Sequence, residues 1–241
     1  GRPPNPPHHE VEEQAEGVQA KRASWATSRV VGSPEPPPPF KTQRVFEKLA
    51  FKNPTVLVTA PGSKRLFVCE QAGKILSFVE DNATVEQTDP VIDLKQDIRT
   101  LPPGGPAKSV GELYGLAFHP QFERNRFAYV CYTVNSAKSG EQLPDGTRVS
   151  RFVVRDTDPP TFDPDSEKIV MTWLGGGHNG GCLVFGPEGY LYITSGDGSF
   201  PNPPDARLAG QDVSNVLSAV LRIDVDHEQD GRPYRIPDDN P

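Results

Sequence analysis

The sequence predicts an all-β protein, a β-propeller of which this chain contains about three four-stranded blades. Short runs of β-branched and aromatic residues come in groups of about four, bounded by Gly, Pro and Asp turns, and the group recurs about every 60 residues. No amphipathic helix lies between successive runs, which disfavours a parallel α/β fold. Small antiparallel sheets repeated in this way are typical of propellers.

The predicted strands follow one another in three blades. The first blade, about residues 46–94, has apolar runs at 55–61, 66–70, 74–78 and 91–94. The second blade, about residues 113–173, has runs at 113–120, 127–132, 149–154 and 168–173. The third blade, about residues 182–241, has runs at 182–187, 190–194 and 220–225. A propeller closes with about four to eight blades, so we expect roughly half of a larger ring, truncated at the C-terminus, with exposed flanks that favour association.

Composition agrees with a fold rich in turns and limits the classes of partner. The 241 residues include 27 prolines and 22 glycines, and 35% of the residues are apolar. The formal net charge is −7, and no basic stripe of the kind that binds nucleic acid is present. No apolar run is long enough to span a membrane. The sequence therefore predicts neither nucleic-acid binding nor a membrane span.

Residues 1–40 differ from the rest of the chain. They are rich in proline and polar residues and contain few apolar ones, so they cannot bury enough surface to offset the entropy of ordering. We expect a disordered Pro-rich tail or linker, in which residues 10–22 could form a short helix. His8 and His9 lie in this tail and are expected to be solvated. The partial propeller should then cover residues 41–241.

A glycine-rich segment, residues 174–181, leads into the third blade and contains His178, and Asp197 follows the second strand of that blade. In an up-and-down sheet, the loop that enters strand one and the loop between strands two and three lie at the same end. We therefore predict His178 and Asp197 on one face. A histidine beside a carboxylate can take a proton from a substrate hydroxyl. The alternative is a structural histidine that only forms hydrogen bonds where two blades meet. The glycines favour a functional histidine, because they permit close approach by a ligand, although they also suit a tight turn.

Other residues are predicted at the same mouth. Gln71 and Glu112 occupy equivalent loops of the first two blades, and Asn179 follows His178. These three are candidates for contact with a substrate.

Two long loops are predicted on the same face, at residues 134–148 and 196–218. Long loops in compact domains usually carry function. Within the second loop, residues 212–219 could form one or two helical turns capped by Asp212.

Two further histidines are expected to have no role in the chemistry. His119 follows strand one of the second blade, so we predict it at the opposite face, packing or capping beside Pro120. His227 lies in the acidic run 224–231, whose glycine falls too late for a calcium loop and which lacks the required glutamate. A solvated turn is expected there.

The three cysteines occur in apolar runs and form no CxxC pair, which is typical of small buried thiols rather than of a zinc site or a disulfide framework. They are Cys69, Cys131 and Cys182.

Five motifs, in this order along the chain, resemble the glucose/sorbosone dehydrogenase family. They are LFVCEQAGKI (66–75), LYGLAFHPQF (113–122), GGGHNGGCLVFGPEGYLYITSGDGS (175–199), VLRIDVD (220–226) and IPDDNP (236–241). The resemblance covers about residues 30 to 241. It implies a six-bladed β-propeller that uses pyrroloquinoline quinone (PQQ) and Ca²⁺, with this chain as its N-terminal half.

By this resemblance, His178 matches the family's catalytic base and Asp197 matches the carboxylate associated with it. The implied function is a PQQ-dependent oxidoreductase that oxidises the anomeric hydroxyl of an aldose to a lactone, with hydride transfer to the quinone. The implied location is periplasmic or secreted, and a cytochrome c is a candidate electron acceptor.

The sequence also departs from the family pattern. Gly177 stands where soluble glucose dehydrogenase has a carboxylate, and the loop before Leu113 lacks a glutamine found there in that enzyme. The residues that hold PQQ and calcium are expected beyond Pro241, so no metal site is expected in this chain. We therefore expect these 241 residues alone neither to bind PQQ tightly nor to turn over.

Two other functions stay open. One is a non-enzymatic propeller that binds a protein or glycan partner, as hedgehog-interacting relatives of this fold do; fold alone does not separate it from an enzyme. The other is a lactone hydrolase on a similar ring, which needs several inward carboxylates around a central metal. This sequence offers no such set of carboxylates.

Overall fold

The structure, a computed structural model, describes residues 40–80, 85–101, 104–200, 202–203 and 205–240. One compact unit begins at Arg44 and contains every described strand. Apart from Phe40, the predicted Pro-rich tail, with its two histidines and its short helix, lies outside the described residues.

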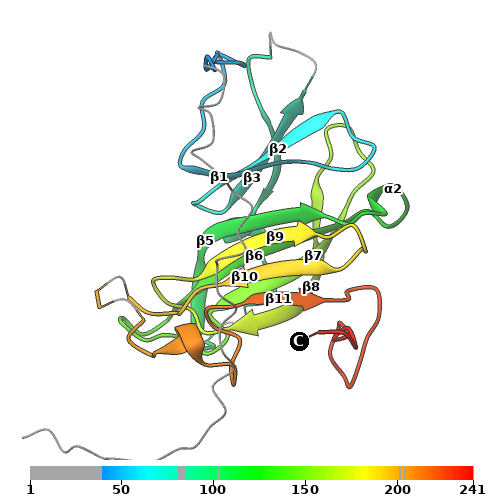
Figure 1. Cartoon of the computed structure of the whole chain (residues 1–241). Helices are drawn as coiled ribbons and strands as arrows, with labels where there is room; N and C mark the ends of the chain where they lie inside the picture. The colour runs from blue at the N-terminus through cyan, green and yellow to red at the C-terminus, as the bar shows by residue number, and fades with distance from the viewer. Residues whose placement is uncertain (1–39, 81–84, 102–103, 201, 204, 241) are drawn as a thin grey trace, which may run out of the picture. The chain divides into compact units, whose positions relative to one another are not determined.

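Three antiparallel sheets contain the strands (Figure 1). The first sheet consists of β1 (Pro54–Thr59), β2 (Arg65–Glu70), β3 (Lys74–Val79) and β4 (Asp89–Asp93). The second consists of β5 (Ala107–Phe118), β6 (Phe127–Ser136), β7 (Thr147–Val154) and β8 (Phe162–Trp173). The third consists of β9 (Gly180–Phe185), β10 (Leu191–Ser195) and β11 (Val220–Ile223). Three short helices, α1 (Leu94–Asp97), α2 (Phe122–Asn125) and the 3₁₀ turn η2 (Ala209–Gln211), lie between strands.

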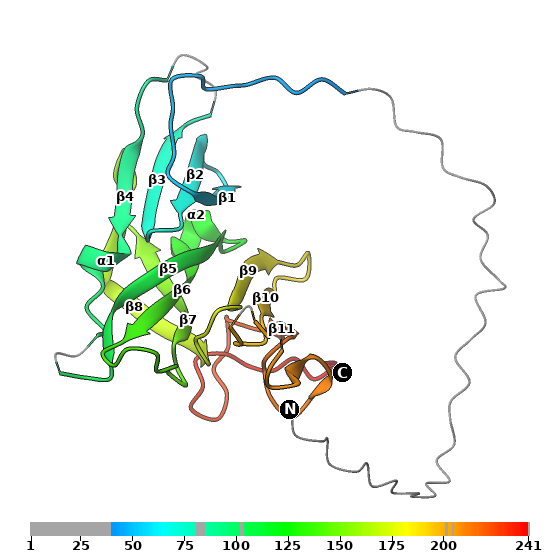
Figure 2. The same cartoon turned by 90° about the vertical axis from the view of Figure 1, so that its left-hand side faces the viewer.

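The sheets follow one another as blades do in a propeller. Strands pair in chain order within each sheet, and the first strand of each sheet contacts the first strand of the next, β1 with β5 and β5 with β9 (Figure 2). Backbone bonding also links the first two sheets, since Leu113 N donates to Gln71 O at 2.9 Å. Thr55 Oγ1 donates to Leu113 O at 3.2 Å. The predicted all-β propeller architecture is confirmed.

The apolar core lies between successive sheets. One buried cluster joins the first and second sheets, where the Phe67 and Phe118 rings lie 4.6 Å apart between centroids. A second cluster joins the second and third sheets around Tyr129 and Leu191. Fully burying a side chain of this size contributes about 1.5–3 kcal/mol, so sheet-to-sheet packing is the main force that fixes the blades.

The entry to the second blade differs from the prediction. β5 begins well before residue 113, so Gly111 and Glu112 lie inside a strand rather than in a loop. The β5–β6 register shifts between Val110 and Leu113, which marks a β-bulge, and Glu112 N donates to Thr133 Oγ1 at 2.9 Å. Bulges bend a strand and redirect its side chains, and the Glu112 side chain is exposed.

The third sheet has three strands in the described part of the chain, not the four predicted for each blade. β11 ends at Ile223 because Asp224 pairs across a turn with Arg235 instead of continuing the ladder.

Two local predictions are corrected. Cys69 and Cys131 are buried, but Cys182 is exposed. It occupies an outward position of β9, where the neighbouring Leu183 points into the core. Residues 212–219 form turns rather than a helix, because Asp212 Oδ1 accepts the Ser214 N–H at 2.9 Å and closes a local side-chain turn.

Candidate functional site

His178 lies in the loop 174–179, which leads into β9, and this loop packs backbone to backbone against residues that follow β10. Ser199 O accepts the N–H of His178 at 3.0 Å and the N–H of Gly177 at 3.1 Å. In return, Gly198 N donates to His178 O at 2.9 Å. The two chain segments predicted to share one face are therefore bonded to each other.

Glycines make this close packing possible. A Cβ atom at Gly176 would lie 1.9 Å from the carbonyl oxygen of Gly198, and a Cβ at Gly196 would lie 2.3 Å from that of His178. Both distances are shorter than non-bonded atoms tolerate. The backbone contact alone explains why Gly176 and Gly196 carry no side chain, so the tight-turn interpretation made from the sequence holds for Gly176 without invoking a ligand.

The Asn179 side chain is bonded to the backbone of its own loop. Its side-chain Oδ1 accepts the Gly176 N–H at 2.7 Å, and its Nδ2 donates to Gly176 O at 2.8 Å. Oδ1 also accepts from the buried Thr147 hydroxyl at 3.2 Å. Asn179 is 5% exposed, so its side chain holds the loop together, whereas its predicted contact with a substrate stays a prediction.

His178 and Asp197 are in contact. The imidazole Nδ1 lies 3.1 Å from Asp197 Oδ1. The carboxylate is fixed by two backbone donors, because Oδ1 accepts the Ser199 N–H and Oδ2 accepts the Asp205 N–H, each at 2.8 Å. The predicted juxtaposition is confirmed, whereas the catalytic roles of the two residues stay predictions.

The hydrogen bond between the two residues selects one tautomer of the neutral imidazole. The Ser199 N–H, followed by the Asp205 N–H and the His178 ring, lowers the pKa of Asp197 below its ordinary value. An ionised carboxylate only accepts hydrogen bonds, so in the neutral form of the ring Nδ1 carries the proton and Nε2 keeps a lone pair. No described residue bonds Nε2, and the His178 side chain is 42% exposed. This arrangement can accept a proton from a hydroxyl group that approaches from solvent.

Tyr114 connects the other predicted mouth residues. Its hydroxyl donates to the Glu112 carboxylate and lies near the Gln71 and Asn179 side chains. Burial, together with the Glu112 contact, raises the pKa of Tyr114 to about 12. The structure therefore brings Gln71 and Glu112 together around one phenol. Tyr114 was not among the residues predicted from the sequence, although its place two residues after Glu112 puts both on one face of β5.

His119 has the structural role that was predicted. It is 1% exposed, its Nδ1 accepts the Gln121 N–H at 3.0 Å, and its Nε2 lies 3.1 Å from Asp226 Oδ1. Burial lowers the pKa of His119. The ring packs 5.2 Å from that of Phe185, which ends β9, so His119 lies at the opposite end of the blade from His178.

The acidic run 224–231 is only partly the solvated turn that was predicted. His227 is 63% exposed, but Asp224 is buried and accepts from Arg235 Nη2 at 2.8 Å, and its Oδ2 lies 2.8 Å from His227 Nδ1. The bonds from His227, the Asp226 N–H and Arg235 lower the pKa of Asp224 despite its burial.

The described residues do not fit calcium or PQQ by themselves. No group of three or more His, Cys, Asp or Glu side chains in the described ranges could hold a metal ion. PQQ carries several carboxylates and needs cations, but the cations near the His178 loop are bonded elsewhere. Arg207 donates to Gln142 at 2.6 Å, and Lys138 pairs with Glu141 at 3.7 Å. Among the described residues, no helix is long and apolar enough to cross a membrane.

Comparison with known proteins agrees with this architecture. The family described as Glucose / Sorbosone dehydrogenase matches residues 51–241. The chain is similar to Hedgehog-interacting protein of Homo sapiens, with 31% identity over 77% of this chain and 26% of that protein. It is also similar to Quinoprotein glucose dehydrogenase B of Acinetobacter calcoaceticus, with 26% identity over 83% of this chain and 42% of that protein.

Solved structures show the same fold. The PQQ-bound aldose sugar dehydrogenase of Streptomyces coelicolor matches with a TM-score of 0.52 and 20% identity, over 76% of this chain and 47% of that one. The soluble aldose sugar dehydrogenase of Escherichia coli, solved in its apo-form, matches with a TM-score of 0.50 and 22% identity, over 79% of this chain and 47% of that one. The chain spans less than half of each of these relatives, and its three sheets correspond to part of their fold. From the family match, together with the sheets and the motifs described above, we conclude that the chain belongs to the glucose/sorbosone dehydrogenase family.

Proposed function

We propose that this chain supplies the proton-accepting part of a sugar dehydrogenase that oxidises the anomeric hydroxyl of an aldose to a lactone. The observation that carries the proposal is the His178–Asp197 pair, in which two backbone N–H groups fix the carboxylate and leave Nε2 of the imidazole free to accept. The family match supports the choice of a sugar as substrate.

The chemistry of this chain is proton transfer. His178 Nε2 accepts the proton of the anomeric hydroxyl while the C1–H bond breaks and its electron pair leaves as hydride, so that the C1–O bond becomes a carbonyl. Asp197 stabilises the imidazolium that forms and keeps the ring oriented. A positioned base contributes about 10²- to 10⁴-fold in rate. PQQ, which the family resemblance implies, would supply the hydride acceptor when bound, and the described residues do not form its site.

A periplasmic or secreted location and a cytochrome c as onward electron acceptor belong to the same proposal. They rest on the family resemblance alone.

The test is dye reduction by the full-length gene product supplied with PQQ and Ca²⁺, with glucose and other aldoses as substrates. His178→Ala should lower turnover by about 10²- to 10⁴-fold while leaving the affinity for PQQ largely unchanged. His227→Ala is the matched control, because that imidazole is also exposed but belongs to the run that follows β11. Unchanged turnover in His178→Ala would remove His178 from the mechanism.

A second candidate is a propeller without enzymatic activity that binds a protein or glycan partner. The observation in its favour is the 31% identity to Hedgehog-interacting protein, a protein named for its interaction with another protein. The same assay separates the two candidates: a full-length product that neither binds PQQ nor reduces dye with any aldose supports the binding function.

A further inference from the structure

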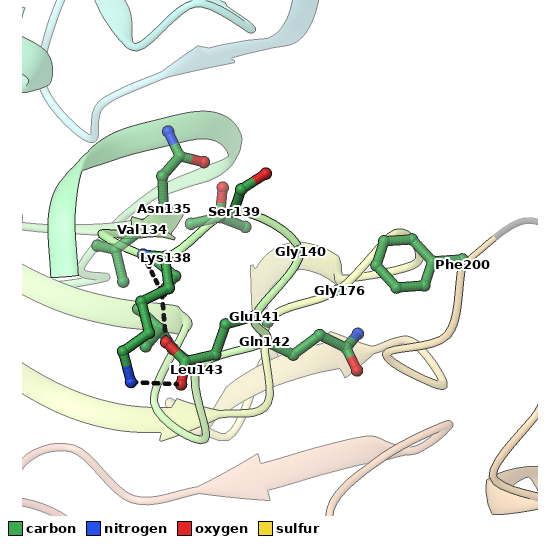
Figure 3. A pocket seen from close by; sticks show the side chains of 13 residues that line it. Val134, Asn135, Lys138, Ser139, Gly140, Glu141, Gln142, Leu143, Gly176 and Phe200 are labelled. Carbon is green, nitrogen blue, oxygen red and sulfur yellow. Dashed lines mark hydrogen bonds and ion pairs between the residues drawn. The ribbon is translucent and has the colours of Figure 1, made fainter. Parts of the chain in front are cut away.

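The interface between the second and third sheets differs between its two ends. At the end that carries His178, a cavity of about 300 Å³ lies between the loop that follows β6 and a wall that includes Phe200 (Figure 3). At the opposite end, the His119 ring fills the interface. It is 1% exposed, and its centroid lies 6.4 Å from that of Tyr129 in β6 and 5.2 Å from that of Phe185 in β9. A side chain that titrates near neutral pH is therefore part of the packing between two blades.

The hydrogen bonds of His119 fix its tautomer. Asn125 Oδ1 accepts the Phe127 N–H at 3.0 Å, so the NH₂ group of Asn125 faces His119 Nδ1, at 2.7 Å. The Gln121 N–H also donates to Nδ1, at 3.0 Å. Two donors on one ring nitrogen require that nitrogen to be an acceptor, so the ring is neutral and carries its proton on Nε2.

One carboxylate faces the other ring nitrogen. Nε2 lies 3.1 Å from Asp226 Oδ1, in the run that follows β11, but the two atoms are not aligned as a hydrogen bond. The Asp226 side chain is 50% exposed, so water and salt screen its charge. The elements around the ring carry these charged or titratable side chains near this end of the blades: Glu123, Arg124 and Arg126 of α2 and its C-cap, Tyr129 of β6, Arg151 of β7 and Asp226.

These surroundings oppose a charge on the ring. Burial lowers the pKa of His119 below its ordinary value, and the opposite effect of Asp226 is smaller. Arg151 adds no compensating negative charge: its guanidinium lies 4.1 Å from the centroid of the Phe127 ring. Asp226 is therefore not enough to keep a buried imidazolium stable.

Protonation of His119 is incompatible with its hydrogen bonds. A proton added at Nδ1 would face the N–H groups of Gln121 and Asn125, so both bonds must break. These bonds close the turn 119–127, which contains α2 and leads from β5 to β6. The imidazolium gains hydration only if this turn opens and the ring leaves its place between Tyr129 and Phe185.

We propose that His119 is an acid-sensitive switch in the interface between the second and third sheets. The neutral ring keeps the turn 119–127 closed, and the imidazolium opens this turn and loosens β9 from β6. The inference does not depend on the proposed function, because it concerns the end of the blades opposite His178.

The direction of the pH effect follows from linkage. A histidine whose folded-state pKa is lowered contributes stability that is fully present above its unfolded-state pKa of about 6.5. This contribution is lost as the pH falls through the folded-state pKa. Because one proton is bound when the turn opens, the opening equilibrium should rise about tenfold per pH unit below the folded-state pKa.

Hydrogen exchange of the full-length gene product, measured by mass spectrometry between about pH 7.5 and pH 4.5, tests the switch. Protection factors of the turn 119–127 and of β9 should fall about tenfold per pH unit below the folded-state pKa of His119, whereas those of β2 and β3 in the first sheet should not change. NMR of ¹³C-labelled histidine should show His119 becoming charged over the same pH range.

His119→Asn removes the titration and keeps an acceptor. The asparagine oxygen can take the place of Nδ1 and accept the Gln121 N–H, but it does not bind a proton in this pH range. The pH dependence of protection in the turn and in β9 should therefore disappear. His227→Asn is the matched control, because His227 is 63% exposed and lies in the run that follows β11, so its removal should leave the pH dependence unchanged.

Two results would overturn the switch. One is protection of the turn and of β9 that does not change with pH in the wild type, and the other is an equal fall in His119→Asn. If His119→Asn does not fold, the two wild-type measurements decide. Charging of His119 without loss of protection, or loss of protection while His119 stays neutral, contradicts the proposal.

Discussion

At the scale of single residues, the site depends on which atom of His178 carries the proton. Asp197 is held by two backbone donors and presents a lone pair to Nδ1. The sequence could predict that the two residues share a face, because blade topology fixes which loops meet. It could not predict the donors from Ser199 and Asp205, because their positions depend on how the loop folds back.

Asp197→Asn tests this assignment. The amide group has the same shape but no charge, so it stabilises the imidazolium less, and its NH₂ group must meet the backbone N–H of either Ser199 or Asp205. We expect turnover to fall, because the ring is then held less firmly and its cationic form is less stable, and ¹⁵N NMR of the imidazole to report the change in its hydrogen bonding. Asp212→Asn is the control, because Asp212 caps Ser214 in the same loop and does not contact His178. Retained turnover in Asp197→Asn would contradict the orienting role.

The lowered pKa of Asp197 also predicts a dependence of stability on pH. Its folded-state pKa lies below the ordinary value of about 3.9. The carboxylate therefore contributes its full stability above pH about 4, and the contribution is lost as pH falls through the folded-state pKa. Urea unfolding of the wild type and Asp197→Asn should show a difference in the free energy of unfolding that shrinks as the pH falls below about 4. A difference that grows in acid would contradict the shift.

At the scale of elements, the sequence predicted the strands well because alternation of apolar residues reports the strand period directly. It placed Gly111 and Glu112 in a loop, because a bulge leaves no signal in the alternation. It predicted Cys182 as buried, because an apolar run does not show which of its two faces is covered. It gave no sign that Asn179 bonds the backbone of Gly176, because only the folded loop brings the two residues together.

Gly176→Ala tests the backbone packing of the His178 loop. The added Cβ meets the Gly198 carbonyl oxygen, so the loop must move, and overpacking of this kind costs about 1–3 kcal/mol. We expect turnover to fall sharply and the protein to become less stable to heat.

Gly189→Ala is the matched control for Gly176→Ala. Gly189 lies in the turn between β9 and β10 with φ of +91° and open space around its Cβ position. The Gly189→Ala variant should lose about 1–2 kcal/mol of folding stability, because alanine is strained in this left-handed backbone conformation. Its turnover should be unchanged. Equal turnover in both variants would show that the loop tolerates movement.

At the scale of the whole molecule, the third sheet has a buried inward face and an outward face with exposed apolar side chains. Leu183, Leu191 and Ile193 face the second sheet and are buried. On the other face, Val184 is 55% exposed and Val220 is 70% exposed. In a propeller such a face packs against another blade. Val184 pairs with Tyr192 and Val220 pairs with Thr194, so the two valines lie on the same face on either side of β10. Exposed apolar side chains gathered on one face favour association.

The 241-residue chain should therefore self-associate through this face, and the double variant Val184→Thr, Val220→Thr should associate less. Threonine keeps the β-branched shape that suits a strand but adds a hydroxyl that water can solvate, so the strands should persist while the apolar patch shrinks. Light scattering coupled to gel filtration measures the change in mass over a range of concentrations. Val213→Thr is the control, because Val213 is fully exposed but lies in a loop away from the sheet. If the double variant associates as strongly as the wild type while Val213→Thr does not, the loop between β10 and β11 is the contact surface and the outward face of the third sheet is not.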